Sequence, residues 1–278
     1  MWNAIKYILV YLGLQLAVAI AMGIVAAVSP LDMTAVLIPS LIISCLLFII
    51  YFVRKKGFGF IKQSFVIHPW RILLFCVPVF LFYLLPEMKI NELLDAPDVL
   101  GMEVWENAFS PVGLIVVGIL APFVEELLFR GAVLPSLLNW DRISGKPWVA
   151  IVISAALFSL AHMNPAQMPF AFMLGVLLGW LYYRTGSLLP GLVIHVINNS
   201  LVCVAGILSY NEEDTGAETL ADLFGSPALE YLAEGVSLLL LFVSIIALVK
   251  VVKEYYPDSP VGADETARQT EIPEQNQP

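Results

Sequence analysis

Eight apolar segments of about 20 residues each dominate the sequence. A helix of about 20 residues is about 30 Å long, which matches the thickness of the hydrocarbon core of a bilayer. The segments are Ile5–Val28, Val36–Val53, Arg71–Leu85, Val112–Leu138, Trp148–Met163, Met168–Tyr183, Leu188–Leu208 and Ala228–Val252. They predict an all-α, polytopic integral membrane protein with about eight transmembrane helices.

The composition excludes an ordinary soluble domain and a nucleic-acid partner. Hydrophobic residues make up 59% of the chain and charged residues 13%, whereas soluble domains are about a quarter charged. The formal net charge is −9, and an acidic chain repels the phosphate backbone. The lipid bilayer is therefore the expected environment, and we expect a multi-pass protein of a bacterial cytoplasmic membrane.

The basic residues indicate the orientation in the membrane. Basic residues lie near the N-terminus, in the loops after the second, fourth and sixth segments, and toward the C-terminus: Lys6; Arg54, Lys55, Lys56 and Lys62, with Arg71 at the end of that loop; Arg142 and Lys146; Arg184; and Lys250, Lys253 and Arg268. The intervening loops are acidic and carry one basic residue, Lys89. Because cytoplasmic loops are enriched in lysine and arginine, the pattern predicts that both termini are cytoplasmic.

Three charged residues interrupt the fourth apolar segment. Each of Glu125, Glu126 and Arg130 costs about 2.5 to 3.5 kcal/mol near the centre of a transmembrane helix, so their presence needs a reason. Glu126 and Arg130 stand four residues apart and can form an ion pair, which is a purely structural interpretation. Glu125 points about 100° away around the helix and is not explained by that pair.

Two of the three histidines also lie in apolar segments. His162 follows Phe158 by one turn, and His195 precedes Asn199 by one turn. A single buried histidine is typically a hydrogen-bonded core residue. Two of them, together with a glutamate and an asparagine, indicate a shared site, because polar groups in lipid face the interior of the bundle. Gly175 and Gly179 form a GxxxG pattern, which predicts close packing of the sixth segment within the molecule.

The polar residues fall into three ordered motifs. "EELLFR" fits EExxxR, "FSLAH" fits FxxxH and "HVINN" fits HxxxN, each on a different predicted helix. In this set the chain resembles the CAAX protease and bacteriocin-processing (CPBP, or Abi) family of intramembrane proteases, which is related to the type II CAAX prenyl endopeptidases. The resemblance covers roughly residues 112 to 205.

The resemblance implies an endopeptidase that cleaves near the C-terminus of a prenylated or membrane-associated peptide. Glu125 would be the general base, helped by His162, while His195 and Asn199 would stabilise the oxyanion. Glu126 and Arg130 would hold the helix and tune the charge of Glu125. These residue types suit such tasks, since a carboxylate in a low-dielectric cavity is a better base and an amide can donate to developing negative charge.

A metalloendopeptidase is an open alternative for the same residues. Glu125, His162 and His195 could hold a catalytic zinc with water as the fourth ligand. The HExxH pattern is absent, and we favour the metal-free mechanism with no cofactor. A second alternative is a proton-coupled transporter or a noncatalytic immunity or scaffold protein. Asn199 discriminates between these classes, because an oxyanion donor is needed in hydrolysis and has no titrating role in a proton relay.

The chain is accordingly divided into four parts. Residues 1–111 contain the first three transmembrane helices and an outer loop, and residues 112–208 form the catalytic core of helices four to seven. Residues 209–255 contain an acidic outer loop and the eighth helix. Residues 256–278 are polar and proline-rich, which is typical of a disordered tail, here on the cytoplasmic side.

Overall fold

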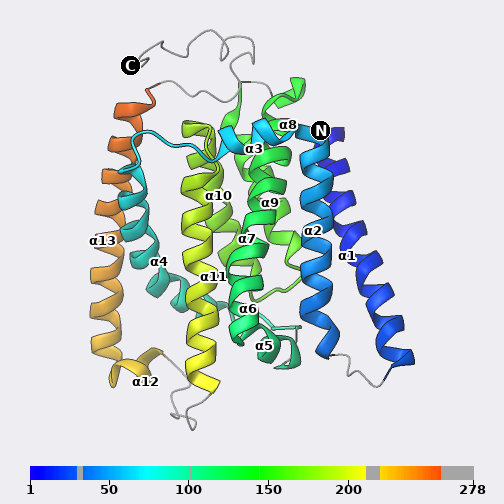
Figure 1. Ribbon diagram of the computed structural model, residues 1–278. Helices are drawn as coiled ribbons and strands as arrows, with labels where there is room; N and C mark the ends of the chain where they lie inside the picture. Colours follow the sequence, from blue (N-terminus) through cyan, green and yellow to red (C-terminus); the bar gives the residue numbers. More distant parts are fainter. Residues whose placement is uncertain (30–33, 101, 144, 211–219, 258–278) are drawn as a thin grey trace, which may run out of the picture.

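In the computed structural model, residues 1–29, 34–100, 102–143, 145–210 and 220–257 are described, and no strand occurs among them. The long helices are α1 (Trp2–Val28), α2 (Leu37–Lys56), α4 (Ile72–Leu94), α9 (Pro147–Ala161), α10 (Met168–Thr185), α11 (Leu189–Tyr210) and α13 (Pro227–Tyr255) (Figure 1). Shorter helices are α3 (Phe58–Ser64), α5 (Met102–Ala108) and α12 (Leu220–Phe224), with single 3₁₀ turns at Thr34–Val36 and Asp141–Ile143. The predicted all-α class is confirmed.

The fourth apolar segment is one continuous but irregular helical unit. It consists of α6 (Pro111–Ile115), η2 (Val116–Leu120), α7 (Ala121–Leu128), η3 (Phe129–Val133) and α8 (Leu134–Leu138), and both η2 and η3 are π-helical. We predicted a single helix here, and the two π-helical turns were not foreseen. They lie on either side of the turn that carries Glu125 and Glu126, and π-bulges within α-helices are frequent at functional sites.

All eight predicted segments are helical, but they differ in their ability to cross a membrane. Among the described residues, six helical units are long and apolar enough: α1, α2, α4, Pro111–Leu138, Leu189–Leu208 and α13. The apolar helix α9 has only 15 residues, and α10 has 18. The two short helices form a hairpin about 25 Å long, beside a unit of about 40 Å from Pro111 to Leu138. Asn164 in the turn of this hairpin is fully buried, so the turn ends inside the bundle.

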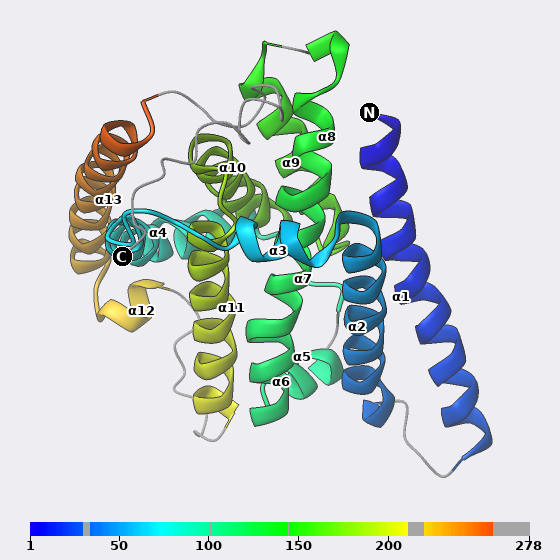
Figure 2. The same cartoon turned by 45° about the horizontal axis from the view of Figure 1, so that its top comes forward.

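The helices form a central group with one pair on each side. Figures 1 and 2 both show α7, α9, α10 and α11 in the middle, with α1 and α2 on one side and α4 and α13 on the other. α1 begins and α13 ends at the same end of the bundle, where α2, α8 and α10 also end (Figure 1). The basic clusters follow these helix ends, as the positive-inside rule requires. That this end is cytoplasmic stays a prediction.

Helix α4 is longer than predicted. We placed the end of the third apolar segment at Leu85, but the helix continues through Pro86 to Leu94. Proline has no N–H and leaves the carbonyl four residues earlier without its helical partner. That carbonyl, of Phe82, accepts a hydrogen bond of 2.9 Å from Ser237 Oγ on α13. The neighbouring helix thus compensates for the proline.

The predicted intramolecular role of the GxxxG pattern is confirmed. A Cβ atom added to Gly175 would lie 3.0 Å from Ala155 Cβ and 3.1 Å from Ala155 Cα on α9. One added to Gly179 would lie 3.2 Å from Ile151 Cγ2. The glycines let α9 and α10 approach closely enough to act as one unit.

We expect Gly175→Leu to destabilise the protein by about 1–3 kcal/mol, because the new side chain must displace the backbone of α9. Thermal unfolding in detergent micelles measures the effect. Gly235→Leu on α13 is the matched control, since a Cβ there meets nothing within 4 Å. Equal unfolding temperatures for the two variants would show that the α9–α10 contact is not tightly packed.

Candidate active site

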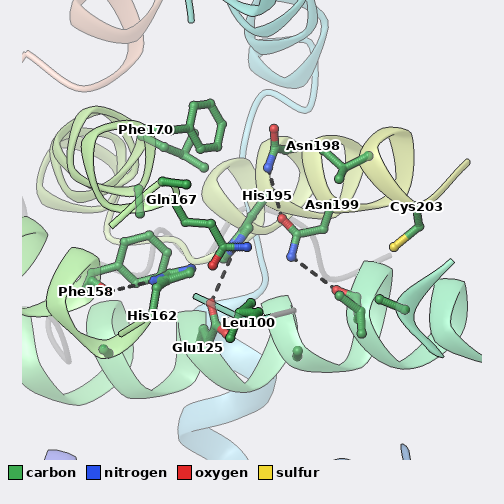
Figure 3. Close-up of a pocket in the computed structure, with 18 of the residues that line it drawn as sticks. Leu100, Glu125, Phe158, His162, Gln167, Phe170, His195, Asn198, Asn199 and Cys203 are labelled. Atoms are coloured by element: carbon green, nitrogen blue, oxygen red, sulfur yellow. Dashed lines mark hydrogen bonds and ion pairs between the residues drawn. The ribbon is translucent and has the colours of Figure 1, made fainter. Parts of the chain in front are cut away.

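A cavity of about 520 Å³ lies between the central helices. Four of the predicted site residues line it, namely Glu125, His162, His195 and Asn199 (Figure 3). The rest of the wall is largely apolar and aromatic, with contributions from Trp105, Phe109, Phe158 and Phe170. A mostly apolar cavity of this size with a few converging polar groups is the usual form of a binding site.

The two adjacent glutamates have different surroundings. The Glu125 side chain is 18% exposed and faces the cavity, whereas that of Glu126 is 0% exposed. Among the described residues, neither Glu125 oxygen accepts a hydrogen bond, and His195 Nε2 lies 3.6 Å from its Oε2. Glu125 is therefore a carboxylate available to a molecule in the cavity.

Glu126 belongs to a buried network behind the cavity wall. Its Oε1 accepts from Arg130 Nη1 at 2.8 Å and lies 3.0 Å from His195 Nδ1. Arg130 also donates from Nη2 to the carbonyl oxygen of Gly175 at 3.2 Å. The predicted ion pair is thus present, and it joins the fourth helical unit to both α10 and α11.

Phe158 packs against the charged network and both histidines. The Arg130 guanidinium carbon lies 4.6 Å from the Phe158 ring centroid, which is the geometry of a cation–π interaction. The same ring meets His162 and His195 edge-to-face, with centroid distances of 4.9 and 5.5 Å. The first residue of the FxxxH motif therefore positions three polar side chains.

The hydrogen bonds assign a tautomer to each neutral histidine. His195 Nδ1 faces a carboxylate oxygen of Glu126, and His162 Nδ1 lies 2.9 Å from the carbonyl oxygen of Phe158. Both oxygens are acceptors, so each Nδ1 carries the hydrogen. The Nε2 atom of each neutral ring then carries a lone pair that can receive a proton.

Asn199 is part of the fold as well as of the cavity wall. Its Nδ2 donates to the carbonyl oxygen of Val117 at 3.2 Å, and its Oδ1 accepts from Asn198 Nδ2 at 3.0 Å. The next residue, Ser200, donates to the carbonyl oxygen of Gly118 at 3.4 Å. These carbonyls stand five and four residues before Pro122, which cannot donate to them. One amide hydrogen of Asn199 is left for a ligand.

The structure brings together all six predicted residues in two layers. Glu125, His162, His195 and Asn199 line the cavity, and Glu126 and Arg130 support them from behind. Two further cavity residues, Asn198 and Gln167, were missed from the sequence. Asn198 stands inside the "HVINN" motif and could have been noticed there. Gln167 lies outside every motif, and nothing in the sequence singles it out.

The donor set does not fit a zinc site. Within the ranges that the structure describes, no three histidine, cysteine, aspartate or glutamate side chains are grouped so that they could hold a metal ion. Catalytic zinc sites need three protein ligands around the ion. Glu125 Oε2 and His195 Nε2 lie 3.6 Å apart, whereas His162 can offer only Nε2, because its Nδ1 donates to the carbonyl oxygen of Phe158.

Comparisons with known proteins agree with the motifs. Residues 107–201 match the family model of the type II CAAX prenyl endopeptidase Rce1-like proteins. The predicted family resemblance is confirmed. The matched segment contains all six predicted site residues.

A curated relative extends the comparison. The membrane-embedded CAAX protease MroQ of Staphylococcus aureus (strain USA300) is 31% identical over 103 residues. The match covers 36% of this chain and 41% of the length of that relative. Among solved structures, no significant match was found.

We expect Arg130→Ala to lower the free energy of unfolding by about 3–5 kcal/mol, because it leaves the fully buried Glu126 carboxylate without its charged partner. Thermal or denaturant unfolding of the purified protein measures the loss. The exposed Arg142, which lies 6.0 Å from the Trp140 ring, serves as control through Arg142→Ala. An unfolding midpoint unchanged in both variants would refute a stabilising role of the pair.

Proposed function

We propose that the protein is an intramembrane endopeptidase of the CAAX prenyl protease type. It hydrolyses a peptide bond near the C-terminus of a prenylated or membrane-associated peptide, using water activated by glutamate and histidine. The proposal rests on the contrast between two adjacent carboxylates. Glu125 faces the cavity and has no hydrogen-bond partner among the described residues, whereas Glu126 is buried and is bound by Arg130 and His195.

The cavity geometry supports a general-base mechanism. A water molecule between Glu125 and the substrate carbonyl gives a proton to the Glu125 carboxylate while the oxygen of the water bonds to the carbonyl carbon. His162 assists by accepting a hydrogen bond at Nε2, which its contact with Phe158 leaves free. When the tetrahedral intermediate collapses, the carbon–nitrogen bond breaks. The proton held by Glu125 passes to the departing amine, so no other acid is required.

His195 and Asn199 stabilise the negative oxygen of the intermediate. Asn199 contributes the amide hydrogen that Val117 does not use. His195 contributes through Nε2 when it carries a proton, and Glu126 accepts from Nδ1 in either state. The fixed orientation of both groups matters, because donors held in place before the reaction need no reorganisation when charge develops.

The surroundings of the site support an apolar or lipid-modified substrate. Aromatic side chains form much of the wall, including Trp105 on α5, Phe109 directly after α5 and Phe170 on α10. The relative MroQ is named a membrane-embedded CAAX protease, and this name is consistent with the assignment. We assign the catalytic core to residues 112–208 and the protein to the bacterial cytoplasmic membrane. No observation favours the transporter or scaffold alternative.

The decisive variant is Glu125→Gln, which keeps the size of the side chain and removes the base. We expect cleavage to fall by about 10²- to 10⁴-fold, with folding retained, since Glu125 makes no hydrogen bond to the described residues that the amide would break. The assay uses purified protein in liposomes with a prenylated CAAX peptide and a panel of membrane-protein fragments, with and without chelator.

Glu254→Gln is the matched control, because that side chain is 60% exposed in the last turn of α13, outside the cavity, and should not affect the rate. If Glu125→Gln cleaves a validated substrate at the wild-type rate, the proposed role of Glu125 is wrong. Loss of activity on chelation, with recovery on addition of zinc, would replace the metal-free mechanism by a metal-dependent one.

A further inference from the structure

The six motif residues provide few hydrogen-bond donors for an oxyanion. In their neutral forms, His162 and His195 use their single N–H on Phe158 and Glu126, and each presents a lone pair at Nε2. Asn199 donates one of its two amide hydrogens to the carbonyl oxygen of Val117. Oxyanion sites commonly combine more than one fixed donor. A further donor in the cavity would complete the site.

Gln167 has the position and the free amide for this role. It lines the cavity, and in Figure 3 its side chain points from the start of α10 toward His162 and His195. Among the described residues, its side-chain amide has no hydrogen-bond partner. Other cavity amides differ in this respect, because Asn198 donates to Asn199 and Asn91 donates to Glu87. The amide of Gln167 therefore has no evident structural task.

The backbone of Gln167 is firmly anchored. Its N–H donates to the carbonyl oxygen of Asn164 at 3.0 Å, and its own carbonyl accepts from Ala171 at 2.9 Å. Asn164 is fully buried and is held by the segment before α5, donating to Asp98 at 3.1 Å and accepting from the N–H of Val99 at 3.2 Å. A polar side chain on such a fixed turn is already placed for a ligand.

We propose that Gln167 is a further catalytic residue whose side-chain Nε2 donates a hydrogen bond to the oxyanion of the tetrahedral intermediate. This role rests on the proposed peptidase function, and it adds to the three motifs a residue that belongs to none of them. The turn between α9 and α10 would then supply both His162, which assists the base, and the opposing amide donor. The short α9–α10 hairpin is what brings this turn to mid-bundle.

The test is steady-state cleavage by Gln167→Leu in liposomes, with the substrate that wild-type protein cleaves. Removal of one oxyanion donor is expected to lower kcat by about 10²- to 10³-fold and to change KM little, because the interaction forms in the transition state. A phosphinate analogue of the same peptide, which mimics the tetrahedral intermediate, should lose affinity by a similar factor. A structural role would lower stability and would not weaken the analogue selectively.

Gln63→Leu is the control, since Gln63 is exposed on α3, at the end of the bundle where α1 begins (Figure 1). If Gln167→Leu is unstable, Gln167→Asn retains the amide but shortens its reach, and the same fall in kcat is expected. Wild-type kcat in both variants, with Glu125→Gln inactive, would overturn the role of Gln167 while leaving the peptidase function intact. Failure of the wild-type protein to cleave any substrate would overturn both.

Discussion

The buried carboxylate of Glu126 is the group on which the rest of the site depends. Uncompensated charge is strongly unfavourable in a low-dielectric interior, so this side chain must be paired and hydrogen-bonded. One oxygen, Oε1, serves both Arg130 and His195. The other, Oε2, lies beside Gly191, where an added Cβ would come within 3.1 Å of it. A larger residue on α11 would therefore disturb the pair and, through it, the orientation of His195.

The irregular fourth helical unit couples the fold to the chemistry. Within a regular α-helix, each backbone carbonyl accepts a hydrogen bond from the same helix, so none is free for a neighbouring helix. Here Pro122 and the π-helical turn before it leave Val117 and Gly118 to be satisfied by Asn199 and Ser200. The hydrogen bonds from Asn199 and Ser200 also hold α11 against this helical unit. The orientation of the Asn199 amide is thus determined by backbone chemistry one helix away.

Sequence patterns predicted the pairing of the charged side chains better than the conformation of the backbone. The ion pair of Glu126 and Arg130 followed from a spacing of four residues, and the separate task of Glu125 followed from the 100° step between neighbours. The π-helical turn before Pro122 and the extension of α4 beyond Pro86 involve hydrogen bonds from side chains of α11 and α13, which are distant in the sequence. Gln167 was missed for a similar reason, because its importance comes from the depth of a turn and not from local spacing.

The position of the cavity links the orientation of the protein to its substrate. The wall includes Trp105 and Phe109 and therefore reaches toward the end where α5 and α6 lie, opposite the end where α1 begins and α13 ends (Figure 1). Glu125 stands near the middle of the unit from Pro111 to Leu138, about 20 Å from either end. If the basic end is cytoplasmic, as the positive-inside rule predicts, the aromatic part of the cavity occupies the outer half of the membrane. Under the proposed peptidase function, this placement favours a membrane-associated peptide whose scissile bond reaches the outer half of the membrane over a peptide that remains in the cytoplasm.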